Sequence, residues 1–174
     1  MSGHSKWSQI KAKKGVTDKK RGALFSKLLK AVKAAARTEP NPDFNPRLRT
    51  AVETAKEANV PMDNITRAIE GSKNADLEDL LIEAYGPGGV AMIIAAVTDS
   101  RNRTMAEIRK ILTDANSKVA EPGSVMWAFE HSKEGEWTAK FPVAIDEETG
   151  NKLDELVDAL DDDEDVINVT TNAS

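Results

Sequence analysis

Residues 86–98 read Gly-Pro-Gly-Gly-Val-Ala-Met-Ile-Ile-Ala-Ala-Val-Thr, a turn followed by an almost unbroken apolar run. A run of this kind, bounded by glycine and proline, is typical of a strand that is covered on at least one face. The preceding residues 77–85 predict a second strand, so residues 86–89 are expected to form a hairpin turn. The turn lacks the Lys-Ser/Thr pair of a phosphate-binding P-loop, which leaves the hairpin as the stronger interpretation.

Helix and strand patterns alternate after this hairpin. Thr104 and Glu107 have the spacing of a capping box, which predicts the start of a helix. Further elements are expected as strands at 124–131 and 136–143, a helix at 146–160 and a strand at 165–170. From Val90 onward the order is β-α-β-β-α-β, with one extra leading strand. This order predicts a ferredoxin-like domain, in which two helices cover one side of an antiparallel sheet.

The first 75 residues have a helical pattern instead. One apolar face recurs at i, i+3, i+4, i+7 and i+11, through Phe25, Leu28, Leu29, Val32 and Ala36. Pro40 ends this helix, Asn45-Pro46 caps and begins a second, and Pro61 precedes a short third. We therefore predict an α+β protein: an N-terminal three-helix bundle at residues 1–75, then the ferredoxin-like domain at 76–174.

Charge is distributed very unevenly between these two parts. The chain of 174 residues has a net charge of −5, yet residues 1–37 contain eleven cations and only one acid. Residues 76–174 contain twenty-two acids and eight cations. A basic arm attached to an acidic body favours a polyanionic partner, because nucleic-acid backbones attract lysine and arginine. Trp7 adds an indole that can stack on an exposed base.

The sequence thus predicts a nucleic-acid contact on the arm and the first helix. The expected contact residues are His4, Lys6, Trp7, Lys11, Lys13, Lys14, Lys19, Lys20, Arg21, Lys27 and Lys30. Arg101 and Arg103, at the entrance of a predicted helix, are candidates for a second phosphate contact. Other targets for the arm are the acidic part of the same chain, since residues 146–174 hold eleven acids and one lysine, and an anionic membrane surface.

Catalytic and metal-binding patterns are missing from the sequence. The chain has no cysteine, and its two histidines, His4 and His131, lie in different segments, so neither a metal cluster nor a catalytic triad is predicted. We expect a non-enzymatic cytoplasmic protein with no cofactor, no small-molecule substrate and no membrane span. The acidic domain is expected to be a scaffold or to contact a protein partner.

Several motifs resemble one family closely. They are Gly3-His4-Ser5-Lys6-Trp7, Asp18-Lys19-Lys20-Arg21-Gly22, Asn45-Pro46-Arg47-Leu48-Arg49, Ala58-Asn59-Val60-Pro61, Tyr85-Gly86-Pro87-Gly88-Gly89-Val90, Thr98-Asp99-Ser100-Arg101-Asn102-Arg103-Thr104 and Gly123-Ser124-Val125. In this order and over nearly the whole chain, they are similar to the YebC/PmpR family, which includes the mitochondrial translational activator of cytochrome oxidase subunit I.

The resemblance implies a DNA-binding transcriptional regulator. Some family members act in translation instead, so contact with ribosomal RNA at the ribosome stays open, as does a protein-interaction module without nucleic-acid contact. Typical members carry a third α/β domain inserted into the second. Here Lys133-Glu134-Gly135 leads directly to Trp137, so the resemblance implies a short form without that insert.

Overall fold

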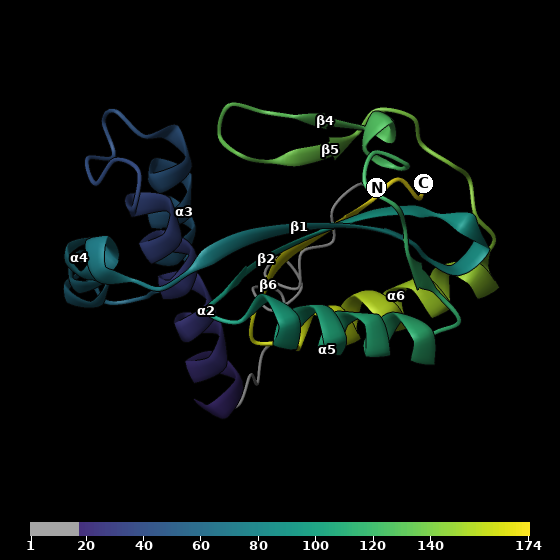
Figure 1. Ribbon diagram of the computed structural model, residues 1–174, viewed down its shortest axis with the longest axis horizontal. Helices are drawn as coiled ribbons and strands as arrows, with labels where there is room; N and C mark the ends of the chain where they lie inside the picture. The colour runs from purple at the N-terminus through teal and green to yellow at the C-terminus, as the bar shows by residue number, and fades with distance from the viewer. Residues whose placement is uncertain (1–17) are drawn as a thin grey trace.

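The computed structural model describes residues 18–174 and consists of a helical bundle beside a sheet layered with helices (Figure 1). The bundle comprises α2 (Asp18–Ala36), α3 (Pro46–Glu57) and α4 (Met62–Glu70), followed by the 3₁₀ turn η1 (Gly71–Asn74). Their inward faces form one apolar cluster that includes Val32, Leu48 and Ile65, each at most 1% exposed.

Asn45 joins the end of α2 to the start of α3. Its side-chain oxygen accepts a hydrogen bond from the backbone N–H of Leu48 at 3.0 Å, as expected for an N-cap, and Pro46 occupies the first turn. The same side chain donates to the backbone oxygens of Ala35, at 2.8 Å, and Glu39, at 2.7 Å. One buried amide therefore satisfies three backbone groups and fixes the angle between the two helices.

The main sheet has four strands in the order β3-β1-β2-β6, and every neighbouring pair is antiparallel. Its strands are β1 (Glu78–Tyr85), β2 (Ala91–Thr98), β3 (Lys118–Val119) and β6 (Val166–Thr171). The turn between β1 and β2 contains the short 3₁₀ helix η2 (Pro87–Gly89). The hairpin deduced from residues 77–98 is thereby confirmed, and it forms the centre of the sheet.

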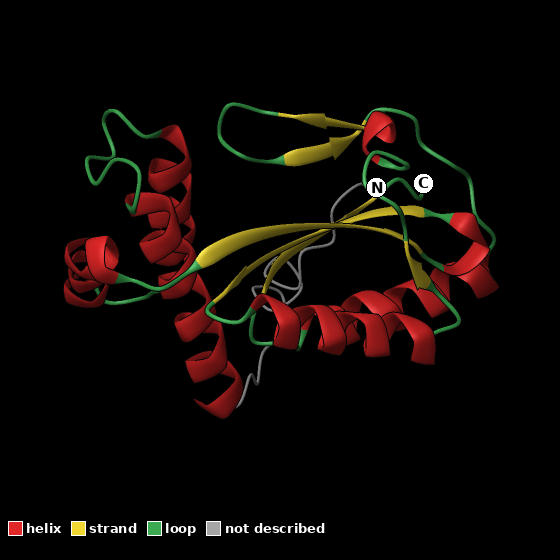
Figure 2. Ribbon diagram, in the orientation of Figure 1, coloured by secondary structure: helices red, strands yellow, loops and turns green. Residues whose placement is uncertain are grey.

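Two helices cover one face of this sheet, α5 (Arg101–Asp114) and α6 (Glu147–Asp161) (Figure 2). Between them and the sheet lies the larger apolar core, in which Met92, Ile94, Ile108, Leu112 and Leu160 are completely buried. No helix among residues 18–174 combines the length and the apolar character that crossing a bilayer requires.

The opposite face carries a separate two-stranded hairpin, β4 (Phe129–His131) and β5 (Trp137–Ala139), preceded by the 3₁₀ turn η3 (Met126–Ala128). Phe129 and Ala128 pack onto Ile93 of β2 and form a third, smaller apolar cluster. Glu83 of β1 is buried beneath the loop that leads into η3. Its carboxylate accepts the backbone N–H groups of Val125 at 2.8 Å and Met126 at 2.9 Å.

The α+β class is confirmed, as is the placement of two helices on one side of an antiparallel sheet. The strand assignment within β-α-β-β-α-β needs correction, because the two expected middle strands form the β4–β5 hairpin outside the main sheet. The expected extra leading strand, β1, is a central strand between β3 and β2. After β3 the chain continues on the other face of the sheet, where the buried carboxylate of Glu83 accepts the backbone N–H groups of Val125 and Met126.

The bundle and the sheet are also in contact, through α2 and strands β2 and β6. The predicted boundary at residue 75 lies between η1 and β1. We propose that residues 1–75 and 76–174 are separate domains, since the two larger apolar clusters share no residue across this boundary.

Candidate nucleic-acid interface

The N-terminal end of α2 carries three of the cations that the sequence predicts as nucleic-acid contacts. Lys19, Lys20 and Arg21 are all exposed, and the fully buried positions of α2 begin only at Val32. Figure 1 shows these first turns projecting beyond α3 and α4. The predicted contact residues His4, Lys6, Trp7, Lys11, Lys13 and Lys14 lie outside the described residues.

Lys27 and Lys30 point in another direction, toward the acidic loop between α6 and β6. The Nζ atom of Lys27 donates to the backbone oxygen of Asp161. The Nζ atom of Lys30 lies 2.7 Å from a carboxylate oxygen of Asp165 and 3.0 Å from the backbone oxygen of Glu164. The predicted contact residues of α2 therefore divide into an exposed end and a half-buried pair that attaches the helix to the acidic part of the protein.

Asp165 is the centre of this attachment. Besides Lys30, its carboxylate accepts hydrogen bonds from Arg103 at 2.8 Å and from the Thr104 hydroxyl at 2.6 Å. Its side chain is only 3% exposed. Burial by itself would raise the pKa of Asp165, but the bonds from Lys30, Thr104 and Arg103 outweigh it and hold that pKa well below the usual range. Asp165 therefore stays ionised and joins α2, α5 and β6.

Arg101 and Arg103, the candidates for a second phosphate contact, lie at the start of α5 beside carboxylates. An Arg101 nitrogen is 3.8 Å from Glu78, and Arg103 bridges Asp165 at 2.8 Å and Asp99 at 2.9 Å. Hydrogen bonds to Asp165 and Asp99 raise the pKa of Arg103 above its ordinary value. These ion pairs weigh against a phosphate contact here, because an incoming anion would meet three carboxylates.

The helix start itself differs from the prediction. α5 begins at Arg101 with Ser100 as its N-cap, and Thr104 is buried in the first turn instead of capping it. The Thr104 hydroxyl bonds to Asp165 and to the backbone oxygen of Ser100. The capping-box interpretation was therefore wrong, because a tertiary partner takes the hydroxyl that the motif assigns to the helix end.

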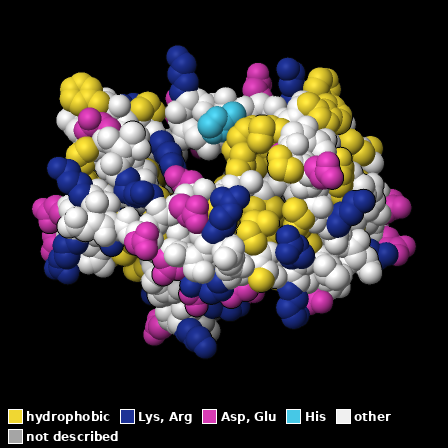
Figure 3. Space-filling model, viewed as in Figure 1, with side chains coloured by type: hydrophobic (Ala, Val, Ile, Leu, Met, Phe, Trp, Pro, Cys, Tyr) yellow, Lys and Arg dark blue, Asp and Glu magenta, His cyan; other side chains and the backbone are white. Residues whose placement is uncertain are grey.

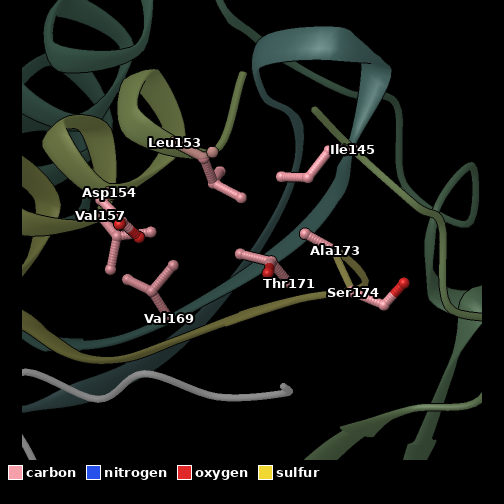
Figure 4. A pocket seen from close by; sticks show the side chains of 9 residues that line it. Ile145, Leu153, Asp154, Val157, Val169, Thr171, Ala173 and Ser174 are labelled. Carbon is pink, nitrogen blue, oxygen red and sulfur yellow. The ribbon is translucent and has the colours of Figure 1, made fainter. Parts of the chain in front are cut away.

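Two other features have some of the properties of a ligand site. Glu107, Asp163 and Asp165 bring carboxylate oxygens within 4.8 Å of one another, but Asp165 is already neutralised by two cations. A pocket of about 230 Å³ lies between α6 and β6, where Leu153, Val157 and Val169 give it an apolar wall (Figure 4). Asp154 is the only ionisable residue among those lining it, so the pocket lacks the convergent polar groups of a catalytic site.

Sequence reasoning missed an aromatic surface around η3. Trp127 is 64% exposed and Phe141 is 50% exposed, with their ring centroids 5.7 Å apart. Aromatic residues make up only 5% of the chain, yet they are concentrated near residues 127–141. This concentration was the only signal of the aromatic surface in the sequence. Their exposure depends on the hairpin leaving the main sheet, which the pattern did not reveal.

Comparison with known proteins agrees with the motifs. Residues 5–75 match the family described as "TACO1/YebC protein N-terminal domain", and residues 77–134 match "TACO1/YebC second and third domain". A "Probable transcriptional regulatory protein" of Chloroherpeton thalassium is 44% identical over 99% of this chain and 71% of its own length. One of Trichlorobacter lovleyi is 48% identical over 75% of this chain and 55% of its own length.

A solved structure has the same fold. The crystal structure of a conserved hypothetical protein from Aquifex aeolicus superposes with a TM-score of 0.81 at 33% identity, covering 98% of this chain and 97% of that one. Both named relatives are longer than this chain, in which residues 132–136 connect β4 to β5. Sequence matches in both halves, together with this shared fold, show that the chain belongs to the TACO1/YebC family, the YebC/PmpR family of the motifs.

Proposed function

We propose that this protein is a non-enzymatic regulator of gene expression that binds nucleic acid through its basic arm and the exposed end of α2, in the cytoplasm. The observation that carries the proposal is the position of Lys19, Lys20 and Arg21, which are exposed on a projecting helix end. They belong to the basic N-terminal stretch, residues 1–37, which contains eleven cations, these three included, and one acid. The names of the relatives support a regulatory role.

Duplex DNA is the partner that we propose first, because the relatives are named probable transcriptional regulatory proteins. Cations on a helix end can neutralise its phosphates without a base-specific contact. Lys27 and Lys30 contribute differently in this proposal. They hold α2 against the acidic loop, so that its N-terminal end is presented outward. The acidic loop repels phosphates and limits the approach of nucleic acid to that end.

The test is fluorescence anisotropy with a mixed-sequence DNA duplex over a range of salt concentrations. Replacing Lys19, Lys20 and Arg21 by alanine should weaken binding and flatten the slope of log affinity against log salt by about 2 to 3, at about 0.9 for each phosphate that is no longer neutralised. The matched control removes the same charge from exposed positions of α5 and α6, Arg109, Lys110 and Lys152. Equal effects of the two triple variants, or no effect of either, would contradict the proposal.

The same measurement with structured ribosomal RNA in place of DNA distinguishes the two nucleic-acid targets. A protein that acts on RNA should bind the RNA more tightly at equal length and salt, and the α2 variant should lose affinity for it in the same way. The DNA proposal requires the opposite order of affinities.

A further inference from the structure

Three aromatic side chains lie on the face of the sheet that carries the β4–β5 hairpin, two of them linked through Ser124 and two through a ring contact. Tyr85 and Trp127 both donate hydrogen bonds to the backbone oxygen of Ser124, at 3.4 and 2.9 Å. The Trp127 ring then meets Phe141 at 5.7 Å between centroids. We call Tyr85, Trp127 and Phe141 the aromatic row.

A lysine lies at each end of this row. Lys118 pairs with Tyr85 across strands β3 and β1, and its Nζ atom is 5.8 Å from the centre of the tyrosine ring. At the other end, the Nζ atom of Lys140 is 5.7 Å from the centre of the Phe141 ring. Figure 3 shows hydrophobic side chains gathered in this region with lysine or arginine side chains beside them.

The row is held rigidly although much of it is exposed. Ser124, whose carbonyl oxygen anchors two of the rings, sits in the loop that the buried carboxylate of Glu83 holds by the backbone N–H groups of Val125 and Met126. The indole of Trp127 is thus fixed by a hydrogen bond while 64% of the residue faces solvent. A prepositioned ring loses little conformational freedom when a flat ligand stacks on it.

We propose that the aromatic row, flanked by Lys118 and Lys140, binds unpaired bases of a single-stranded nucleic acid. This inference rests on the proposed function and adds a second contact surface to it. Exposed rings offer stacking platforms for bases, and cations beside them neutralise the phosphates on either side. Paired bases inside a duplex are already stacked, so the row selects single strands. Stacking does not require a 2′-hydroxyl, so RNA and DNA strands both qualify.

The location also favours a polyanion over an acidic or neutral partner. The row lies on the opposite side of the sheet from α5 and α6, and therefore away from the carboxylate-rich loop that follows α6 (Figure 1). The Nζ atoms of Lys118 and Lys140 lie over the rings of Tyr85 and Phe141. A protein partner would require only the apolar surface, whereas an unpaired strand uses the rings and the lysines together.

The test compares fluorescein-labelled decauridylate, decathymidylate and a mixed-sequence duplex by anisotropy with the full chain. Trp127→Ala and Phe141→Ala should each weaken binding of both single strands about 5- to 150-fold, the range for loss of one stacked base. Duplex binding should change less than twofold. Phe44→Ala is the matched control, because Phe44 is 76% exposed but lies in the loop before α3.

A second measurement does not depend on removing a ring from the row. In a Trp7→Phe, Trp137→Phe variant, Trp127 is the one remaining tryptophan of the three. Its fluorescence should be quenched by decauridylate and decathymidylate and left unchanged by the duplex. Lack of quenching by either strand refutes the proposal, as does an equal loss of single-strand binding in Phe44→Ala.

Other outcomes identify what has failed. A dimer in gel filtration that Trp127→Ala converts to a monomer would overturn the inference, because the row would then be a self-association surface. If the wild-type protein binds the duplex and the α2 variant does not, while both aromatic variants bind single strands normally, only this inference fails. If the wild-type protein binds neither duplex nor single strands, the proposed function fails with it.

Discussion

Replacing Asp165 by asparagine tests the attachment of α2 to the acidic loop. The substitution keeps the size of the side chain but removes the charge that faces Lys30 at 2.7 Å and Arg103 at 2.8 Å. Removing one partner of a buried ion pair costs about 3–5 kcal/mol. The lower end applies here, because Arg103 retains Asp99 and Lys30 retains the backbone oxygen of Glu164. We therefore expect a loss of about 3 kcal/mol in the free energy of unfolding.

Urea denaturation followed by circular dichroism measures this loss. With a slope of about 2 kcal/mol per molar urea, the midpoint should fall by about 1.5 M while the slope stays the same. Glu164→Gln is the matched control: it removes one negative charge from the same loop at an exposed position, and should change stability by less than about 0.5 kcal/mol. Equal stability of Asp165→Asn and wild type would refute the central role assigned to Asp165.

The same pair of proteins should differ in their dependence on pH. The pKa of Asp165 is lower in the folded protein than the value of about 3.9 expected when unfolded. Its ionised form therefore stabilises the fold above about pH 4, and this contribution is lost as the pH falls toward the folded-state pKa. The difference between wild type and Asp165→Asn should be constant from about pH 7 to 5 and should shrink below about pH 4.

Three further predictions concern other parts of the fold and are tested by urea denaturation. Glu83→Ala should cost about 3 kcal/mol and speed proteolysis within residues 123–126, because backbone N–H groups of that loop lose a buried acceptor. Asn45→Ala should cost about 2 kcal/mol, since the cap and two buried backbone contacts disappear together. Gly88→Ala should cost more than Gly89→Ala: both have positive φ, but only at Gly88 would a Cβ meet another side chain, at 2.8 Å.

The helical half was predictable because its signals are local. The i, i+3, i+4 pattern of α2 and the Asn45-Pro46 start of α3 each depend on residues a few positions apart. The central hairpin was equally local, since its turn and both strands are contiguous. Where local chemistry and tertiary packing agree, periodicity and capping residues are sufficient to predict a helix or a strand.

The errors occurred where a partner far along the chain decides the outcome. The alternation of apolar and polar side chains along β1 assigns Glu83 to the solvent side. Glu83 is instead buried under a loop about forty residues later in the chain, where the backbone N–H of Val125 donates to its carboxylate. Thr104 has the spacing of a cap, but its hydroxyl bonds to Asp165, 61 residues away. The β4–β5 hairpin, which lies outside the main sheet, follows directly on the loop that donates to Glu83.

The basic face of α2 shows how far functional residues can be predicted from the sequence. Lys20, Lys27 and Lys30 are equivalent by residue type, charge and position on an amphipathic helix. Only the folded chain separates them by burial, because Lys20 is exposed whereas Lys27 and Lys30 are half-buried and donate to residues 161–165. Counting the lysines of α2 therefore overestimates the positively charged surface that phosphates can reach. The count also misses that Lys27 and Lys30 have a structural role.

This division gives the acidic half of the protein a role in presenting the basic half. The loop around Asp165 holds α2 by its middle, which leaves the N-terminal end projecting past the bundle. The aromatic row lies on the other side of the sheet, beside the hairpin. In the two proposals, a short duplex held at the end of α2 leaves the row free, so that the two surfaces would engage different segments of a nucleic acid. Loss of either surface should therefore reduce affinity for its own segment alone, whereas loss of Asp165 should alter how α2 is presented without touching the row.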